Sequence, residues 1–367
     1  MKWLILTWFI FVYMNPLSAQ PDQRNPEKAE ECGVCHEEIF QQWQTSMHHS
    51  STADKDILYK KMMAWAVEDT KGKAKKMCRQ CHYPYAMFES PVVSQTVANE
   101  RSIDCAYCHS IDQIDMPSVF TKTKYSRNNN TQSEYHTIEA REHFTNNELC
   151  FKCHDVLTNP NKVHICITGM EYDTQNKRQS CNHCHMPQLP ASNADNKDGG
   201  YLASHQFAGP HNADFIKGSL GLKYVLDKDS LIITVDNSAT PHAYPTGSPL
   251  RQVILKVEGF NKNEQKVFQN WQENPFKEAP EALFVRLFAG KDGNFPVPPW
   301  RAVEVERDTR LKAGKKRQVT YSIPVNTHSI NLQLLFRLAP VTILNKLNID
   351  DPYLRKAHLI RQVDIII

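Results

Sequence analysis

One short pattern, Cys-x-x-Cys-His, occurs five times in this chain and accounts for ten of its 11 cysteines. Two thiols at this spacing lie about one helical turn apart, and the histidine follows directly. The arrangement allows two thioether bonds to one porphyrin and one bond from the imidazole to its iron. The five copies are Cys32–His36, Cys78–His82, Cys105–His109, Cys150–His154 and Cys181–His185.

Paired cysteines also occur in zinc sites, redox-active dithiols and disulfide frameworks. None of these explains a histidine after every second cysteine. We therefore predict five covalently attached haem c groups, each with one iron. The predicted attachment residues are Cys32, Cys35, Cys78, Cys81, Cys105, Cys108, Cys150, Cys153, Cys181 and Cys184. The predicted proximal iron ligands are His36, His82, His109, His154 and His185.

Residues 1–19 have the features of a secretory signal peptide. Lys2 is basic, residues 3–14 are apolar, and Leu17-Ser18-Ala19 provides small residues before a cleavage point near Ala19. The apolar run is shorter than the ~18 residues that indicate a transmembrane helix. We expect an exported protein, periplasmic or extracellular, whose mature chain has no transmembrane segment.

The motifs all lie between residues 32 and 185, which indicates two domains of different composition. We predict an α+β multidomain protein, with a mainly helical and irregular pentahaem domain at 20–212 and an antiparallel β-sandwich at 213–367. The haem domain has too few residues per motif for a conventional core, so the porphyrins should form it. Predicted strands are Leu231–Val235, Val253–Val257, Leu283–Phe288, Ala302–Val305, Val319–Ile323, Leu332–Phe336 and Val363–Ile367.

Eleven of the 16 histidines lie outside the proximal positions, enough to fill the second axial position of every iron. This surplus favours bis-histidine coordination, while His328 and His358 lie in the strand-rich half and are expected to be ordinary. The candidates are His48, His49, His136, His143, His164, His183, His205, His211 and His242. Methionine is the rival ligand, with Met47, Met170 and Met186 near the motifs. The unpaired Cys166 is expected to be a small buried hydrophobe rather than a reactive thiol or iron ligand.

Cys32–His36 followed by Trp43-Gln-Thr-Ser46-Met-His48 resembles multihaem cytochromes c of the cytochrome c-552/4 domain type. Ile103-Asp104-Cys105, Glu134-Tyr135-His136, Cys184-His185-Met186-Pro187 and the stretch from Ser204 to His211 resemble later blocks of the same family. The resemblance implies that His48, His136, His205 and His211 are distal ligands.

A further stretch, His242-Ala-Tyr-Pro245-Thr246-Gly247, resembles an element of relatives that have a β-rich C-terminal domain, with Pro241 where those relatives have glycine. His242 therefore joins His49, His143 and His164 as a second group of distal candidates.

Two functions fit these features. We expect an exported electron carrier, not an enzyme, that passes electrons along mostly bis-histidine haems. The alternative is a multihaem oxidoreductase with one open iron that acts on nitrite, hydroxylamine or a sulfur oxyanion. Expected partners are redox proteins, such as a membrane quinol-oxidising complex or a terminal reductase, and homo-oligomers are compatible with the sequence. The formal charge of +3 is offset by haem propionates, so no nucleic-acid partner is expected.

Overall fold

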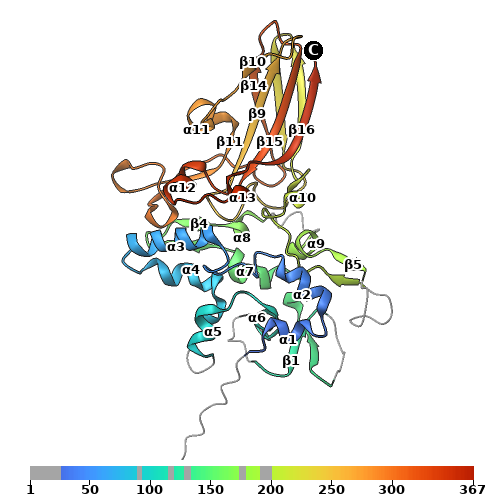
Figure 1. The fold of residues 1–367 in the computed structure, drawn as a ribbon, viewed down its shortest axis with the longest axis vertical. Helices are drawn as coiled ribbons and strands as arrows, with labels where there is room; N and C mark the ends of the chain where they lie inside the picture. Colours follow the sequence, from blue (N-terminus) through green and yellow to red (C-terminus); the bar gives the residue numbers. More distant parts are fainter. Residues whose placement is uncertain (1–25, 89–92, 115–119, 128–133, 173–178, 191–200) are drawn as a thin grey trace, which may run out of the picture.

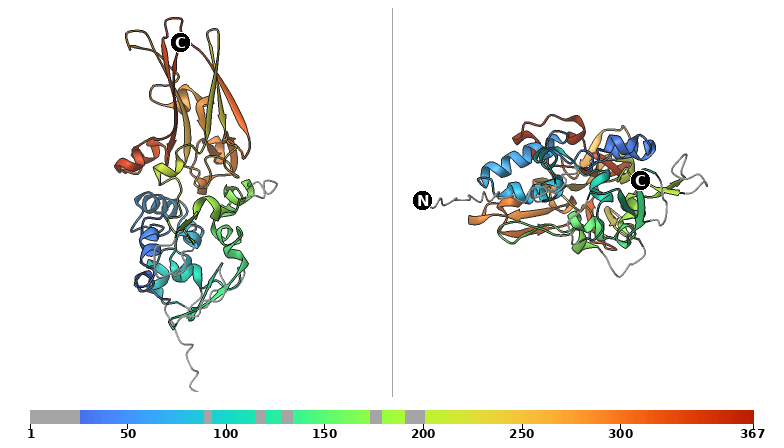
Figure 2. Two further views of the ribbon diagram at one scale, coloured as in Figure 1. Left: turned by 90° about the vertical axis from the view of Figure 1, so that its right-hand side faces the viewer. Right: turned by 90° about the horizontal axis from the view of Figure 1, so that it is seen from below.

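The computed structural model describes residues 26–88, 93–114, 120–127, 134–172, 179–190 and 201–367. A helical part that contains the five motifs and a β-rich part that contains the C-terminus are stacked along the longest axis of the molecule (Figure 1). Two further views show that the C-terminus lies in the β-rich part (Figure 2). The predicted signal peptide, residues 1–19, lies outside the described residues.

The helical part consists of short helices joined by turns and by two-stranded sheets. Its helices are α1 (Ala29–Gly33), α2 (Glu37–Gln44), α3 (Ile57–Asp69), α4 (Ala74–His82), α5 (Gln95–Glu100), α6 (Cys105–His109), α7 (Glu148–His154), α8 (Thr168–Glu171) and α9 (Cys181–His185). Its strands are β1 (Thr123–Ser126), β2 (Thr137–Ala140), β3 (Leu157–Thr158), β4 (His164–Cys166), β5 (Gln188–Pro190) and β6 (Tyr201–Ala203).

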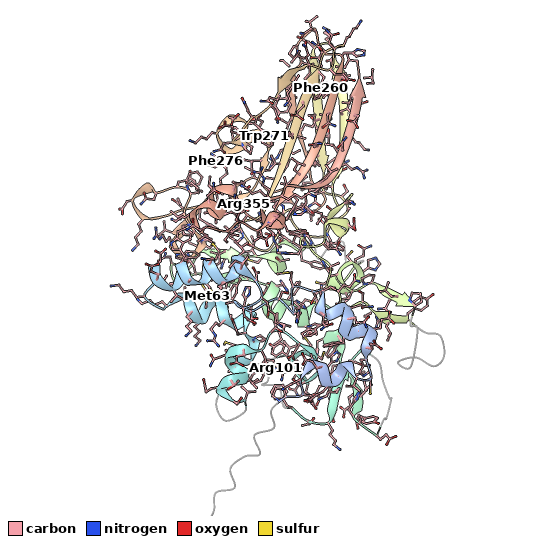
Figure 3. The ribbon with its side chains drawn as sticks, viewed as in Figure 1. Met63, Arg101, Phe260, Trp271, Phe276 and Arg355 are labelled. Carbon is pink, nitrogen blue, oxygen red and sulfur yellow. The ribbon has the colours of Figure 1, made fainter. Side chains whose placement is uncertain are left out.

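Aspartate side chains cap two of these helices. Asp56 accepts a hydrogen bond of 3.0 Å from the backbone N–H of Tyr59 at the start of α3, and Asp104 accepts one of 3.1 Å from Tyr107 at the start of α6. Such caps satisfy N–H groups that have no partner within the helix. Asp104 is buried and also pairs with Arg101, which lies in the lower half of the helical part (Figure 3). The α6 cap thereby fixes the segment that carries the third motif.

The β-rich part contains three antiparallel sheets, with strand orders β10-β9-β15-β16, β14-β8-β7 and β12-β13, and β11 pairs with β9. Its elements are α10 (Ala213–Ile216), β7 (Gly221–Asp227), β8 (Ser230–Asp236), β9 (Gln252–Phe260), β10 (Lys266–Gln269), α11 (Pro275–Glu278), β11 (Leu283–Phe284), β12 (Arg286–Ala289), β13 (Glu304–Asp308), β14 (Lys316–Ser322), β15 (Ser329–Arg337), α12 (Val341–Lys346), α13 (Pro352–Arg355) and β16 (His358–Ile366).

One hydrophobic core joins the two larger sheets. Leu231, Ile233 and Val235 of β8 are fully buried at alternating positions, as expected for a strand with one apolar face. They belong to the same cluster as Leu332 and Leu334 of β15. Burial of this kind is the main favourable contribution to folding. The helical part has only small side-chain clusters, which agrees with the prediction that its side chains alone do not form a large core.

The two parts are joined by direct polar and aromatic contacts. The Asp69 carboxylate at the end of α3 accepts hydrogen bonds of 2.7 Å from the Trp300 indole and from Arg301 Nε. The Trp300 ring also meets Trp65 edge to face, with centroids 5.0 Å apart. Because Asp69 and Trp65 belong to α3, this helix anchors the β-rich part to the motif-bearing part.

Every predicted strand overlaps an observed strand, and three differ clearly in their bounds. The Val363–Ile367 strand begins earlier, at His358. Leu283–Phe288 is divided into β11 and β12, because the intervening Val285 bonds to Thr309 instead: its carbonyl accepts from the Thr309 backbone N–H, and its own N–H donates to the Thr309 hydroxyl. The Ala302–Val305 strand begins later, at Glu304. Strand β7 was not predicted, because Lys223, Tyr224 and Val225 are all exposed and the alternation of polar and apolar residues is lost. Helix α3 begins at Ile57, directly after the Asp56 cap.

Candidate functional site

Each motif is positioned by a short helix. The helices α4, α6, α7 and α9 end at the motif histidines His82, His109, His154 and His185, and His36 directly precedes α2. A helical conformation places residues three apart on the same side, which brings both cysteines of a motif together. The motifs therefore have the local geometry that haem attachment requires.

Four motif histidines face a second histidine from a distant part of the chain. The ring centroids of His36 and His136 are 6.1 Å apart, and those of His48 and His154 are 6.3 Å apart. The separation is 6.3 Å for His109 and His205 and 6.5 Å for His185 and His242. The planes within each pair are inclined by 31°, 33°, 26° and 23° in the same order.

This separation fits one metal ion between each pair of rings. Metal–nitrogen bonds of about 2 Å from two opposed imidazoles place the ring centroids about 6 Å apart. Imidazoles that pack directly on each other are closer, as the 3.8 Å between His82 and Tyr59 illustrates for a stacked pair. The four pairs therefore have room for an iron and are too far apart for direct stacking.

Backbone carbonyl groups fix the proton position in several of these imidazoles. Nδ1 lies 2.7 Å from the Tyr125 carbonyl in His109 and 2.6 Å from the Ala208 carbonyl in His185. The distal candidates His205 and His242 make the same contact at 2.8 and 2.9 Å. A carbonyl only accepts, so Nδ1 carries the proton and Nε2 keeps the lone pair that binds a metal.

Burial keeps these imidazoles neutral. It lowers the pKa of His48 to about 3, and neighbouring imidazoles lower it further. Burial likewise lowers the pKa values of His154 and His205 to about 4. Neutral imidazole is the form that ligates metals, so the environment favours ligation at neutral pH.

His82 differs from the other motif histidines. Its Nδ1 lies 2.8 Å from the Ser51 carbonyl, which again leaves Nε2 available. Its aromatic neighbour is Tyr59, with ring planes inclined by 6°, and the Tyr59 hydroxyl donates to Met63 Sδ at 3.6 Å. Met63 lies on α3 in the helical part (Figure 3). All sixteen histidines belong to the described ranges, and none of them faces His82 as in the four pairs.

The structure gives other surroundings to the remaining candidates. His49 meets Trp43 edge to face at 4.6 Å, and His143 Nε2 lies 3.0 Å from the Ile111 carbonyl. His164 Nδ1 contacts the Thr158 hydroxyl at 2.8 Å. His183 is exposed on α9.

His211 was one of the four distal candidates taken from the family resemblance. The structure places its ring 6.3 Å from that of Tyr353, whose hydroxyl donates to the His211 carbonyl at 2.6 Å. Among the described residues, no ring contact joins His211 to a motif histidine. His242, from the second group, lies opposite His185 instead.

The cysteine sulfur atoms show which motifs are neighbours. Cys32 of the first motif lies within hydrogen-bonding distance of Cys105 of the third. Cys153 of the fourth motif has the same relation to Cys81 of the second, and Cys150 of the fourth to Cys181 of the fifth. The electrostatic influence of Cys153 on Cys108 connects the fourth motif with the third. The fourth motif is therefore central, with three neighbouring motifs.

Phe207 lies between two of the histidine pairs. Its ring centroid is 4.3 Å from that of His48 and 5.7 Å from that of His205. These two histidines face the fourth and third motifs respectively. The contact supports the neighbour relation derived from the cysteines.

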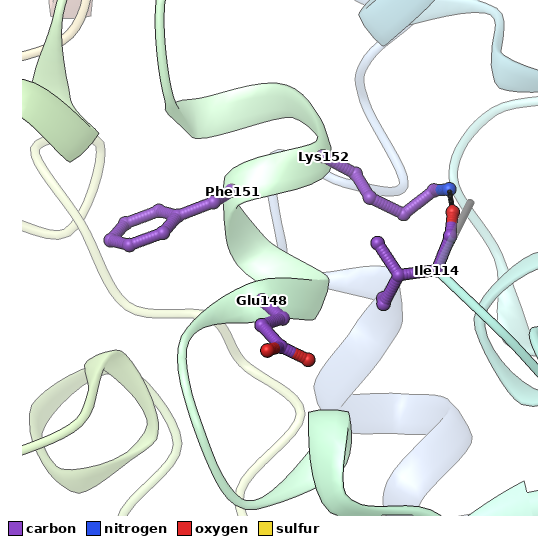
Figure 4. A pocket seen from close by; sticks show the side chains of 4 residues that line it. All are labelled: Ile114, Glu148, Phe151 and Lys152. Carbon is purple, nitrogen blue, oxygen red and sulfur yellow. Dashed lines mark hydrogen bonds between the residues drawn. The ribbon is translucent and has the colours of Figure 1, made fainter.

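A surface pocket of about 420 Å³ lies on the outer side of the fourth motif and is lined by Ile114, Glu148, Phe151 and Lys152 (Figure 4). Lys152 donates a hydrogen bond to the Ile114 carbonyl across this pocket (Figure 4). Phe151 and Lys152 are the two residues between the motif cysteines. The pocket therefore lies beside the two residues that separate the cysteines of the fourth motif.

Two residues of the site were missed in the sequence, Tyr59 and Arg251. The sequence contains one indication of Tyr59: it lies four residues before Met63, so the two side chains share one face of a helix and are able to contact each other. Arg251 donates to the Thr246 carbonyl at 2.8 Å and affects the pKa of His154. It follows the stretch that begins at His242, but no spacing rule connects an arginine there with the fourth motif.

The fold and the paired histidines define a class of protein with several c-type haems. The family described as "Cytochrome c554 and c-prime" matches residues 31–110. A penta-heme cytochrome c552 from Thermochromatium tepidum has a similar structure, with a TM-score of 0.77 and 25% sequence identity over 93% of this chain and 99% of that chain. The comparison with curated proteins found no match.

The chain belongs to the multihaem cytochromes c, as its sequence motifs predict. It carries five covalently attached haem c groups, one for each motif, and it has a redox role. No helix in the described segments has the length and apolar character needed to cross a membrane.

Proposed function

We propose that this chain is an electron-transfer cytochrome in which four haems have two histidine ligands each. The proposed pairs are His36 with His136, His154 with His48, His109 with His205 and His185 with His242. The four ring separations near 6 Å are the observation on which this proposal rests. The bound haems supply one-electron redox chemistry, and two histidine ligands favour low reduction potentials.

The protein contributes neighbouring attachment points, axial ligands and exclusion of water. The cysteine contacts support a branched order, in which the first motif adjoins the third, and the fourth adjoins the third, second and fifth. Such an order would give electrons more than one exit from the fourth position. Redox proteins would be the donor and the acceptor.

The surroundings of His82 favour a second candidate function. A haem on the second motif would lack a second histidine, since none of the sixteen histidines faces His82 as in the four pairs. An iron without a distal protein ligand is able to bind a small molecule. The second candidate is therefore an oxidoreductase that acts at this motif on a small nitrogen or sulfur compound, with the other four positions supplying electrons.

Electron paramagnetic resonance of the purified holoprotein tests both candidates. Four low-spin ferric haems and one high-spin haem per chain, with one equivalent of carbon monoxide bound after reduction, would support an open iron at the second motif. Five low-spin haems that bind no carbon monoxide would exclude the oxidoreductase and leave the carrier. More than one high-spin haem would contradict the four proposed pairs. A haem assay that gives five haems per chain is the necessary control.

We further propose export through residues 1–19 and a division into a pentahaem domain at 20–212 and a β-sandwich domain at 213–367. The core shared by β8 and β15 supports the sandwich. N-terminal sequencing of the secreted protein would test the export, since it would begin near Gln20.

A further inference from the structure

Arginines gather around the Cys166 thiol at the junction of the helical and β-rich parts. Cys166 ends β4, Arg251 directly precedes β9, Arg286 begins β12 and Arg310 follows β13. All three guanidinium groups and the Glu171 carboxylate act electrostatically on the thiol. We call these five residues, together with Asp308, the arginine cluster.

Arg310 is fully paired within the cluster. Its guanidinium donates to Glu171 and makes hydrogen bonds of 2.7 and 2.8 Å to the Asp308 carboxylate. Thr246 donates to the other oxygen of Glu171 at 2.5 Å. The side chains of Arg310 and Glu171 are both 8% exposed. The charge of Arg310 is therefore compensated by Glu171 and Asp308, and Arg310 needs no additional anion.

Arg286 is not satisfied in the same way. Arg286 is 7% exposed. Among the described residues, its guanidinium donates one hydrogen bond, from Nη2 to the His164 carbonyl at 2.9 Å. The nearest Asp308 oxygen is 3.9 Å from Nε, beyond hydrogen-bonding distance. Nε and Nη1 are buried, and no group in the described residues accepts a hydrogen bond from either. Burying a cation with unpaired hydrogen-bond donors costs free energy, and a bound anion would reduce that cost.

Arg251 adds a second cation near the same thiol. It is partly buried, and its Nη1 donates to the Thr246 carbonyl. Gly247 makes room for it, since a Cβ there would lie 2.6 Å from Nη1. The cluster thus holds three cations against the two carboxylates of Glu171 and Asp308. Burial raises the pKa of Cys166 to about 11, so the thiol is protonated near neutral pH and is able to donate a hydrogen bond.

We propose that Arg251 and Arg286, with the Cys166 thiol, form a buried binding site for an oxyanion. Planar guanidinium groups recognise carboxylates and similar oxyanions through parallel hydrogen bonds. Two sources have this chemistry, a propionate group of an attached haem and a free small oxyanion from solution. Two motifs lie near the site, since the Cys166 thiol acts on Cys81 of the second motif and Arg251 acts on His154 of the fourth. The site does not depend on the coordination of the His82 haem.

The test compares the holoprotein with Arg286→Gln, Arg286→Lys and Arg307→Gln. Arg307 is the matched control, because it belongs to β13, pairs across from Leu287, and packs its guanidinium 5.5 Å from the Phe276 ring centroid. Each protein is titrated with sodium sulfate by calorimetry. The midpoint potentials of its haems are then measured over a pH series around neutrality.

A free-oxyanion site predicts one sulfate per chain in the wild type, binding at least tenfold weaker in Arg286→Gln, and little change in Arg307→Gln. A propionate site predicts no sulfate binding. In that case Arg286→Gln favours the oxidised form of one haem tenfold, about 59 mV for a one-electron couple, and its midpoint becomes pH-dependent because the freed carboxylate takes up a proton.

The proposal is overturned if folded Arg286→Gln shows neither effect, or only a pH-independent shift that Arg307→Gln also shows. If Arg286→Gln does not fold, Arg286→Lys decides by the same measurements. Lysine keeps the charge and lacks the planar fork, so it should weaken sulfate binding or make the midpoint pH-dependent. Wild-type behaviour of Arg286→Lys in both measurements would then overturn the site.

Discussion

The phenol ring of Tyr59 stacks on the imidazole of His82, with centroids 3.8 Å apart and planes inclined by 6°. Tyr59 is buried on α3, so its ring occupies one side of the second motif histidine. We expect Tyr59→Ala to lower the free energy of unfolding by about 3 kcal/mol, as other buried aromatic truncations do. Tyr59→Phe keeps the ring and loses only the contact with Met63, so it should cost about 1 kcal/mol or less. Urea denaturation of the holoproteins measures both changes. Equal losses would show that the hydroxyl group, and not the stacked ring, matters.

His48→Ala should convert one low-spin haem to high-spin. In the proposed pairing His48 faces His154, so its removal leaves the fourth iron with one protein ligand. The adjacent His49 provides the matched control, because its ring contacts Trp43 instead. Electron paramagnetic resonance should show one additional high-spin equivalent in His48→Ala and no change in His49→Ala. The opposite pattern would assign the ligand to His49.

Gly247→Ala should destabilise the protein more than Gly314→Ala. Both glycines have positive φ, 77° and 66°, so each substitution carries the backbone cost of about 1 kcal/mol. A Cβ at Gly247 would also meet Arg251 Nη1 at 2.6 Å, whereas a Cβ at Gly314 meets no atom within 4 Å. Thermal denaturation should therefore show a larger decrease in Tm for Gly247→Ala. Equal decreases would indicate that Arg251 moves aside without cost.

Asp69→Asn should weaken the contact between the two parts in a pH-dependent way. Hydrogen bonds from Arg301 are the main reason why the pKa of Asp69 lies below its usual value. The folded state therefore holds this proton less tightly than the unfolded state. The stabilisation is complete above the usual Asp pKa of about 3.9 and is lost as the pH falls through the lowered value.

At about pH 7 we expect Asp69→Asn to lower the free energy of unfolding by about 1 kcal/mol. The effect is small because Arg301 is half-exposed and water screens the pair. Urea denaturation at about pH 7 and about pH 3 should show that the difference from the wild type decreases in acid. Asp214→Asn is the control, since Asp214 and its partner Lys217 are both well exposed. A difference that persists in acid would mean that the charge of Asp69 is not responsible.

The local parts of the site were predictable because they depend on short spacing. Cys-x-x-Cys-His determines which residues attach a haem, whatever the rest of the chain does. The Trp43-x-x-Ser46-x-His48 element predicted His48 as a distal ligand from local spacing, and the Trp43 indole donates to the Ile103 carbonyl at 2.9 Å, close to the third motif. Which imidazole faces which motif was not predictable, because each pair joins distant segments.

The special position of His82 was hidden by the surplus of histidines. His143 Nε2 contacts the Ile111 carbonyl, so a count of histidines overstates the supply of distal ligands. In the β-rich part, apolar alternation identified β8 and β15, whereas the exposed face of β7 left no such pattern. Asp69 contacts Trp300 and Arg301, which lie far away in the chain, so the amino-acid composition did not predict this contact.

His242 lies beyond the last motif, in the stretch between β8 and β9, yet its ring faces His185. In the proposed pairing, the boundary between the motif-rich and the strand-rich halves is thus a boundary of composition and not of cofactor binding. In the proposed pairing, a shortened chain that ended at residue 212 would keep every thioether attachment and lose one axial partner, His242. Gain or loss of the C-terminal half during evolution would therefore change the potentials of redox centres while leaving their number unchanged.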